Sequence, residues 1–289
     1  MRRSWMWVAA AVLLVVAGGF RPAGADPGTG VFAAWEMDED PGDPVLRDAG
    51  PNGLDGTIGS SVDTALPSAH SWDTVAPDSS PLDPGRLDLV PHDPALNPDA
   101  ERFAVLVRLR TTSPQANVVQ KGQSATSGGF FKIDMGDGRV ACLFKGAQGT
   151  LHVRSAQRID DGDWTDVHCE RSAGSLSLRI DGVLVDRRDG STGTVANTWP
   201  LSIAGKWSCD QGSVGCDYFS GALDRVLVAR AEGVDTMGTV SPPTSTVPPT
   251  TTPTIAPTTT STTTTVKPKP ATTTTVKPKP TPSTTKVVK

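Results

Sequence analysis

Residues 176–183 are LSLRIDGV, in which two leucines and an isoleucine alternate with a serine and an arginine. A period of two places the apolar side chains on one face of a β-strand. The pair Asp181-Gly182 that follows is one of the strongest short signals for a hairpin turn. This stretch therefore predicts a strand that ends in a tight hairpin.

The same alternation recurs on both sides of this stretch. No segment between residues 28 and 232 has the period of an amphipathic helix. Many short strands joined by hairpin turns are typical of an antiparallel sandwich or barrel, so we expect an all-β fold. The loop-rich segment from Ser60 to Asn97 is the hardest part to assign. The apolar positions predicted to share the inward face are Phe103, Val105, Val107 and Leu109; Phe131, Ile133 and Met135; and Val140, Cys142 and Phe144. Val226 and Val228 are predicted in a late strand.

The charge is distributed unevenly along the 289 residues. The whole chain has a net charge of −4, but residues 1–25 carry +3 and residues 239–289 carry +6, so residues 26–238 carry −13. A nucleic-acid-binding protein needs its basic stripe on the folded domain, so this acidic segment disfavours that class. No internal apolar run approaches the roughly 18 residues of a membrane-spanning helix. We expect one soluble domain over residues 26–238, with no nucleic-acid partner and no membrane span after signal removal.

Residues 1–25 have the three parts of an export signal. Met1–Arg3 is the positive start, Trp5–Val16 is the apolar stretch, and Ala23–Ala25 supplies the small residues that a signal peptidase requires. An N-terminal anchor helix is the less favoured alternative, because the apolar stretch is short and ends in Gly18-Gly19. We therefore expect a secreted protein that is extracellular or loosely associated with the cell wall.

Residues 239–289 differ from the rest of the chain in composition. They are dominated by Thr and Pro, lack aromatic residues, and contain the repeat TTTTVKPKP at residues 262–270 and again at 272–280. Such a segment has too little apolar surface to offset the entropy of ordering its backbone, so we expect a disordered tail. The favoured role is a solvated spacer. The alternatives are an O-glycosylated stalk and a basic strand that contacts an anionic cell-wall polymer.

Four cysteines in an exported chain most simply form two disulfides. Cys142 and Cys169 each lie in phase with apolar neighbours, so both are expected to point inward from neighbouring strands. Cys209 and Cys216 can close a short loop locally. We therefore expect the pairs Cys142–Cys169 and Cys209–Cys216. A metal–thiolate site is disfavoured, because a second short-spaced cysteine pair is missing and the expected compartment is oxidising.

A series of short motifs spans nearly the whole of residues 26–238. They are Val31–Glu39 with Asp48–Thr57, Arg102–Val107, Val119–Gly122, Asp161–Cys169, Leu176–Val183 and Asp217–Val226. In this order they resemble the motifs of laminin-G-like domains of the concanavalin A-like lectin/glucanase superfamily, although Thr165 stands where that family usually has histidine. The resemblance implies a two-sheet antiparallel jelly-roll sandwich with one concave sheet. It also implies that Trp35 and Trp164 are buried core residues.

This superfamily contains both glucanases and non-catalytic lectins, so the fold alone does not decide the activity. A retaining glycosidase needs two carboxylates about 5 Å apart. The acidic run Glu36–Asp40 superficially echoes the E-x-D-x-x-E strand of laminarinase-type enzymes, but its last acid is displaced and Pro41-Gly42 ends the strand. We interpret the run as a solvated strand end or a loop beside a metal, and expect no enzyme activity. The four histidines are predicted in loops (His70, His92) or on strand surfaces (His152, His168).

The turn from Asp48 to Asp55 favours a calcium site over a catalytic site. Calcium takes about six to eight oxygen ligands, and Asp48 and Asn52 supply such oxygens. In similar domains this turn approaches the closing strand, where Asp224 lies. The ion would be structural, fixing the first loop against the last strand, and no other cofactor is expected. The alternative is that Asp48 and Asn52 are turn residues only.

A saccharide-binding surface needs exposed aromatic rings beside polar groups, because the C–H faces of sugars stack on rings. The candidates are Trp72, Trp199, Trp207 and Tyr218, which lie in or beside predicted loops, although each could instead pack within its loop. We expect a secreted, non-catalytic module that binds a carbohydrate or another extracellular or cell-wall surface. The alternatives are a structural or adhesive protein-binding domain tethered by its tail, and a divergent glycoside hydrolase.

Overall fold

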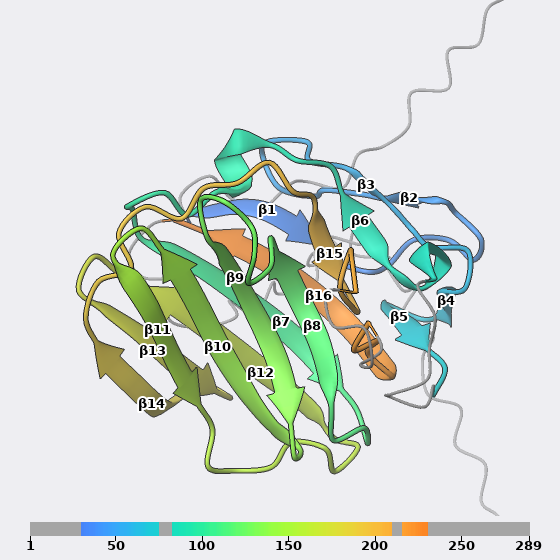
Figure 1. Cartoon of the computed structure of the whole chain (residues 1–289). Helices are drawn as coiled ribbons and strands as arrows, with labels where there is room; N and C mark the ends of the chain where they lie inside the picture. The colour runs from blue at the N-terminus through green and yellow to red at the C-terminus, as the bar shows by residue number, and fades with distance from the viewer. Residues whose placement is uncertain (1–29, 75–82, 210–215, 231–289) are drawn as a thin grey trace, which may run out of the picture. The chain divides into compact units, whose positions relative to one another are not determined.

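The computed structural model describes residues 30–74, 83–209 and 216–230 (Figure 1). The predicted signal peptide and the predicted tail lie outside the described residues. Within these ranges the regular structure is β-strand, except for the single 3-10 turns η2 (Pro84–Arg86) and η3 (Pro94–Leu96). None of the described segments forms a helix that could span a membrane. The expected all-β fold is confirmed.

One of the two antiparallel sheets, sheet A, contains the first and last described strands. Its strands are β1 (Val31–Trp35), β4 (Asp63–Leu66), β5 (Ala69–Trp72), β7 (Phe103–Arg110), β12 (Trp164–Arg171), β13 (Ser175–Ile180), β14 (Val183–Asp189) and β16 (Gly221–Ala229). They lie in the order β14-β13-β12-β7-β16-β5-β4, and β1 also pairs with β16. Because β1 pairs with β16, the beginning and the end of the sandwich are adjacent, and the Arg230 N–H donates to the Gly30 carbonyl at 3.1 Å.

The other sheet, sheet B, packs on sheet A to form the expected jelly-roll sandwich, and Figure 1 shows β8, β9 and β10 in front. Its strands are β2 (Val45–Leu46), β3 (Gly56–Thr57), β6 (Asp88–Val90), β8 (Ala116–Lys121), β9 (Phe130–Gly136), β10 (Arg139–Gly146), β11 (Gly149–Arg154) and β15 (Leu201–Ile203). They lie in the order β11-β10-β9-β8-β15-β6-β3-β2.

The hydrophobic core lies between the sheets, and every position predicted to face inward is buried in it. The ring of Phe103 on β7 packs against Phe131 on β9 with centroids 5.2 Å apart, and Phe131 stacks on Phe144 at 5.4 Å. Burial of one such side chain stabilises the fold by roughly 1.5–3 kcal/mol. Alternation in the sequence therefore located the core correctly.

The predicted hairpin turn after β13 is also present. Asp181 and Gly182 have φ angles of +50° and +78°, and the flanking residues Ile180 and Val183 pair with each other. Positive φ at both central residues is the geometry that matches the twist of hairpin strands, and Asp-Gly adopts it readily. The turn fixes the register of β14 against β13.

Both predicted disulfides are present in the structure. Cys209 and Cys216 close a local loop with Cα atoms 4.8 Å apart. Cys142 and Cys169 have Cα atoms 6.0 Å apart, but they are not on neighbouring strands: Cys142 is on β10 of sheet B and Cys169 on β12 of sheet A. Inward phase is the same for strands that face each other across a sandwich as for strands within one sheet, so phase alone could not distinguish the two arrangements.

Candidate functional site

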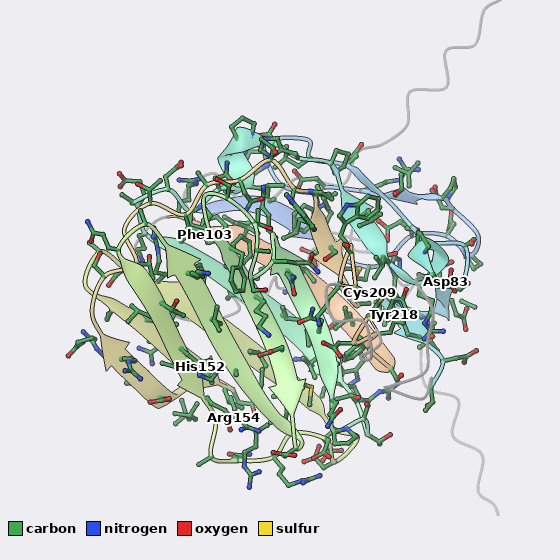
Figure 2. All side chains as sticks on the ribbon, viewed as in Figure 1. Asp83, Phe103, His152, Arg154, Cys209 and Tyr218 are labelled. Carbon is green, nitrogen blue, oxygen red and sulfur yellow. A yellow bond between two sulfur atoms is a disulfide. The ribbon has the colours of Figure 1, made fainter. Side chains whose placement is uncertain are left out.

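Two of the four predicted aromatic ligand residues are buried, and those predictions are wrong. Trp72 lies on β5, not in a loop, where it packs edge-on against Phe219 and its Nε1–H donates to the Arg86 carbonyl at 2.9 Å. The hydroxyl of Tyr218 accepts the backbone N–H of Asp83. Figure 2 shows Tyr218 near Asp83 and Cys209. Both side chains therefore hold the fold together and present no face to a ligand.

Trp207 is the one of the four predicted aromatic residues that is exposed, with 40% of the residue's surface accessible. It lies between β15 and β16, two residues before Cys209, which is bonded to Cys216. On one side of Trp207, the Lys206 N–H donates to the Cys216 carbonyl at 3.1 Å, and the Lys206 ammonium pairs with Asp217 at 2.6 Å. The backbone is thus fixed before Trp207 while the indole remains at the surface.

The segment is also held after Trp207. Gln123, just beyond β8, donates its side-chain N–H to the Ser208 carbonyl. Two contacts of Lys206 therefore precede the indole and one contact of Ser208 follows it, and the partners come from different parts of the chain. Such a residue is positioned for binding at little cost in backbone entropy.

Trp199 is half-buried, and its segment is fixed by the buried residue Lys121 at the end of β8. The Lys121 ammonium donates to the Asn197 carbonyl at 2.9 Å, to Asn197 Oδ1 at 3.2 Å and to the Trp199 carbonyl at 2.8 Å. His92 Nδ1 lies 3.3 Å from the same nitrogen. Burial lowers the pKa of Lys121 to about 8. The backbone of Trp199 is therefore held by Lys121, and the residue itself is partly exposed.

The two tryptophans that the family resemblance placed in the core differ. Trp35 is buried as expected, and its Nε1–H donates to the Leu54 carbonyl at 3.0 Å. Trp164 is half-buried on the face of sheet A that points away from sheet B, so that expectation is wrong. The guanidinium carbons of Arg108 and Arg110 lie 5.6 and 4.9 Å from its ring centroid. The phase of β12 explains the difference, because Val167 and Cys169 face inward and Trp164 is out of phase with them.

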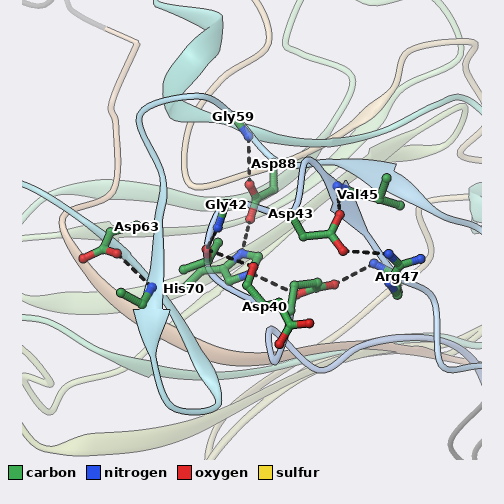
Figure 3. Close-up of polar contacts among 12 residues, drawn as sticks. Asp40, Gly42, Asp43, Val45, Arg47, Gly59, Asp63, His70 and Asp88 are labelled. Carbon is green, nitrogen blue, oxygen red and sulfur yellow. Dashed lines mark hydrogen bonds and ion pairs between the residues drawn. The ribbon is translucent and has the colours of Figure 1, made fainter.

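A buried charged group at His70 was missed by the sequence prediction (Figure 3). His70 lies on β5, not in a loop; its Nδ1 is 2.8 Å from Asp88 Oδ2 and its Nε2 is 2.9 Å from Glu39 Oε2. Burial disfavours the imidazolium, but the two carboxylates outweigh this effect and raise the pKa of His70 to about 9. All three side chains are buried, so the group cannot meet a substrate and is structural.

The interpretation of Glu36–Asp40 as a solvated strand end is therefore wrong for Glu39. Glu39 Oε1 also accepts the Arg47 N–H at 2.6 Å. Glu36 is bound as well, since its Oε2 pairs with Arg225 Nε at 2.6 Å; burial raises the pKa of Glu36 and Arg225 opposes the shift. Both glutamates are committed to partners in the fold, which does not support a catalytic carboxylate pair.

Two of the other histidines lie on strands β11 and β12. His152 is exposed on β11, as predicted, and Figure 2 shows it beside Arg154. His168 was predicted at the surface but is buried, with Nε2 3.7 Å from Glu170 Oε2. Its phase on β12 does point outward, but side chains around it cover the ring.

The residues predicted to bind calcium do not converge. Asp48 forms a bridge to Trp35 of β1, whereas β16, which carries Asp224, pairs with the opposite edge of β1. Two inter-strand spacings, roughly 10 Å, therefore separate the two aspartates. Asp224 pairs instead with Arg108 at 2.9 Å, and the Asn52 amide donates to the Phe32 carbonyl at 2.7 Å.

The Asp48 carboxylate itself is occupied by backbone donors. Its Oδ1 accepts the N–H groups of Ala34 and Gly50 at 2.8 and 2.7 Å, and its Oδ2 accepts the Leu54 N–H at 2.7 Å. Residues 30–74, 83–209 and 216–230 contain no group of three or more His, Cys, Asp or Glu side chains arranged to hold a metal ion. This geometry fits the turn alternative better than a calcium site, and calcium binding stays a prediction.

Comparison with known proteins bears directly on this fold. Residues 109–231 match the family model of the laminin G domain. Over this range the chain is laminin-G-like. The matched range runs from the end of β7 through β16, and therefore includes the Trp207 segment and both disulfides of the laminin-G-like domain. No curated protein matches the chain by sequence.

Solved structures are similar to the laminin-G-like domain in fold. Domains LG4-5 of the mouse laminin alpha1 chain are 14% identical, with a TM-score of 0.45 over 57% of this chain and 42% of that one. The binding domain of Paraclostridial Mosquitocidal Protein 1 is 13% identical, with a TM-score of 0.50 over 71% and 49%. The binding domain of botulinum neurotoxin DC, in complex with rat synaptotagmin II, is 12% identical, with a TM-score of 0.51 over 71% and 49%. The chain thus spans less than half the length of these solved chains.

Proposed function

We propose that the laminin-G-like domain is a non-catalytic binding module that recognises a saccharide through Trp207. The observation that carries this proposal is the exposed indole, held by Lys206 on one side and Ser208 on the other. An indole face supplies the flat apolar surface on which the C–H face of a sugar stacks. A rigid backbone reduces the entropy lost on binding.

Two further observations support a binding role over catalysis. Glu36 and Glu39, the acids that echo a glucanase motif, are bound to Arg225 and His70. Two of the similar solved structures are toxin binding domains, one of them in complex with a protein. These relationships are distant, so they favour the class of function and not a particular ligand.

We also propose that the protein is secreted and contacts the cell wall. Two disulfides favour an oxidising compartment, which agrees with an exported protein. The export signal at residues 1–25 supports secretion, and the basic residues of 239–289 support a contact with an anionic cell-wall polymer. Binding of the secreted chain to isolated cell walls, lost when residues 239–289 are removed, would test the tail's role.

A glycan array probed with the purified full chain tests the saccharide proposal. We expect Trp207→Ala to reduce binding to the recognised glycan at least roughly fivefold, the equivalent of about 1 kcal/mol of stacking. Leu184→Ala is the matched control, because it truncates another exposed apolar side chain, 46% exposed on β14. Equal binding by Trp207→Ala and the unaltered chain would contradict the proposal. Release of reducing sugar from a bound polysaccharide would instead identify a glycoside hydrolase.

A second candidate function is protein binding at the edge of sheet A. The edge strand β14 exposes two apolar residues, Val183 and Leu184, which are 64% and 46% exposed. An edge strand has unpaired backbone groups to which another protein can add a strand. Leu184→Lys should abolish such an interaction while leaving glycan binding at Trp207 intact, so the two candidates are separable in one set of variants.

A further inference from the structure

A row of side chains crosses the outer face of sheet A, the face that points away from sheet B. Ser71 on β5 lies opposite Ala222 on β16. Ala222 lies opposite Arg110 on β7, which in turn lies opposite Trp164 on β12. Directly opposed residues project from the same face with Cβ atoms roughly 5 Å apart. Because alanine has the shortest of these side chains, the row has a gap between Ser71 and Arg110.

This gap belongs to a shallow groove of about 260 Å³. Three residues of the row, Ser71, Ala222 and Arg110, line the groove together with Thr112, Gly162 and Gly221. Gly162 and Gly221 have φ angles of +87° and +137°, which side-chain-bearing residues rarely adopt. A Cβ at Gly221 would lie 2.2 Å from the Arg110 carbonyl oxygen. Bare backbone is therefore required at these two positions, and it keeps the wall of the groove low.

The charge in the groove comes from Arg110. Its neighbour on the same face, Arg108, pairs with Asp166 at 3.0 Å and with Asp224 at 2.9 Å. Arg110 is exposed and forms no ion pair with a described residue; its guanidinium carbon lies 4.9 Å from the Trp164 ring centroid. Contact with the ring positions the guanidinium while its N–H groups remain available to a ligand.

Hydroxyl groups accompany this cation. Ser71 and Thr112 line the groove, and their hydroxyls have no hydrogen-bond partner within the described part of the chain. A hydroxyl both donates and accepts, so the two can bond to the hydroxyls of a sugar ring. A guanidinium beside two hydroxyls matches a ligand that carries a carboxylate on a polyhydroxylated ring.

We propose that the groove between Ser71 and Arg110 binds an acidic saccharide, with Arg110 paired to its carboxylate and Ser71 and Thr112 bonded to its hydroxyls. The net charge of −13 on residues 26–238 opposes the approach of a long polyanion, so a single uronic acid unit or the end of a chain fits better. The site is on strands β5, β16 and β7, separate from the Trp207 segment, and does not depend on the function proposed there.

An NMR titration of the full chain with sodium glucuronate at low ionic strength tests this proposal. We expect saturable binding, with glucose and acetate at least about tenfold weaker, because each lacks one half of the recognised chemistry. Arg110→Gln should weaken glucuronate binding at least about tenfold. Arg179→Gln is the matched control, since it removes the same charge from the same face of sheet A on β13. Trp207→Ala should leave glucuronate binding unchanged, which separates this site from the proposed function.

A second variant tests the shape of the groove without changing its charge. Ala222→Val fills the gap beside Arg110 and should weaken glucuronate binding, while an unchanged melting transition shows that the variant is folded. The proposal is overturned if the unaltered chain shows no saturable binding, if acetate binds as well as glucuronate, or if Arg179→Gln reduces binding as much as Arg110→Gln does.

Discussion

Cys142 on β10 is bonded to Cys169 on β12, so a covalent bond joins sheet B to sheet A through the core. The two cysteines are separated by 27 positions, and the chain-entropy model gives roughly 3–4 kcal/mol of stabilisation for a loop of this length. The Cys209–Cys216 bond closes a loop with a separation of only 7 and connects no sheets. The first bond therefore stabilises the sandwich, and the second holds the Trp207 segment.

We predict different consequences for the loss of each disulfide. The double substitution Cys142→Ala and Cys169→Ala should lower the free energy of unfolding by about 3–4 kcal/mol, measured by urea denaturation. Cys209→Ala with Cys216→Ala should cost less, about 2–3 kcal/mol, and should weaken any glycan binding by Trp207. A larger loss of stability from the second pair than from the first would contradict this assignment.

His70 predicts a pH dependence of stability. Its pKa rises from an unfolded value of about 6.5 to about 9 in the fold. The protonated histidine therefore contributes its full stabilisation below pH 6.5, and that contribution is lost as the pH rises toward 9. The difference in unfolding free energy between the unaltered chain and His70→Gln should shrink across this window by an amount of the order of 3 kcal/mol. A difference that stays constant with pH would show that His70 is neutral in the fold.

The lowered pKa of Lys121 predicts a change of stability with pH that is opposite in sign to that from His70 and occurs at higher pH. Its pKa falls from about 10.5 in the unfolded chain to about 8 in the fold, so the unfolded state binds more protons between these values. Stability should therefore rise with pH in that window, and Lys121→Met should abolish the rise. The substitution should also cost about 1–3 kcal/mol at neutral pH, because it leaves buried carbonyls of Asn197 and Trp199 without a donor. Urea denaturation at pH 7, 8 and 10 measures both effects.

Asp48 predicts stabilisation that is independent of calcium. Asp48→Ala removes the acceptor for the N–H groups of Ala34, Gly50 and Leu54, and should lower the unfolding free energy by about 1–3 kcal/mol. Millimolar calcium or a chelator should leave the melting temperature of the unaltered chain unchanged. If calcium does bind the folded state, a hundredfold excess over its Kd should raise stability by about 2.7 kcal/mol, and this result would restore the calcium site.

Long strands were predictable from the sequence because each contains several repeats of the apolar–polar alternation. On β7 and β9 the apolar positions alternate over most of the strand, and every predicted inward residue is buried. β5 has only four residues, and a segment rich in proline and aspartate follows it, so neither His70 nor Trp72 showed a recognisable period. The charged His70 group was therefore invisible to local patterning, since its carboxylates come from distant parts of the chain.

Candidate sites were less predictable than the core for a related reason. Loop position was taken to mean exposure for Tyr218, but another loop, at Asp83, covers it. For Trp164 the family resemblance predicted burial, whereas the strand phase set by Val167 indicates the outer face, where the structure places it. Arg110, on which the acidic-saccharide proposal depends, follows Leu109 and is therefore out of phase with the core residues of β7. Its lack of an acidic partner could not be predicted, because that depends on residues of three strands together.

The hydrogen bond between Arg230 and Gly30 has a consequence for engineering. The first and last residues of the described sandwich are neighbours, because β1 pairs with β16. A short linker could therefore join these two residues, and new termini could be opened in a surface loop. For the same reason the whole sandwich could be inserted as a unit into a loop of an unrelated host protein. Both Trp207 and Arg110 would keep their surroundings in such a fusion, since neither lies at the junction.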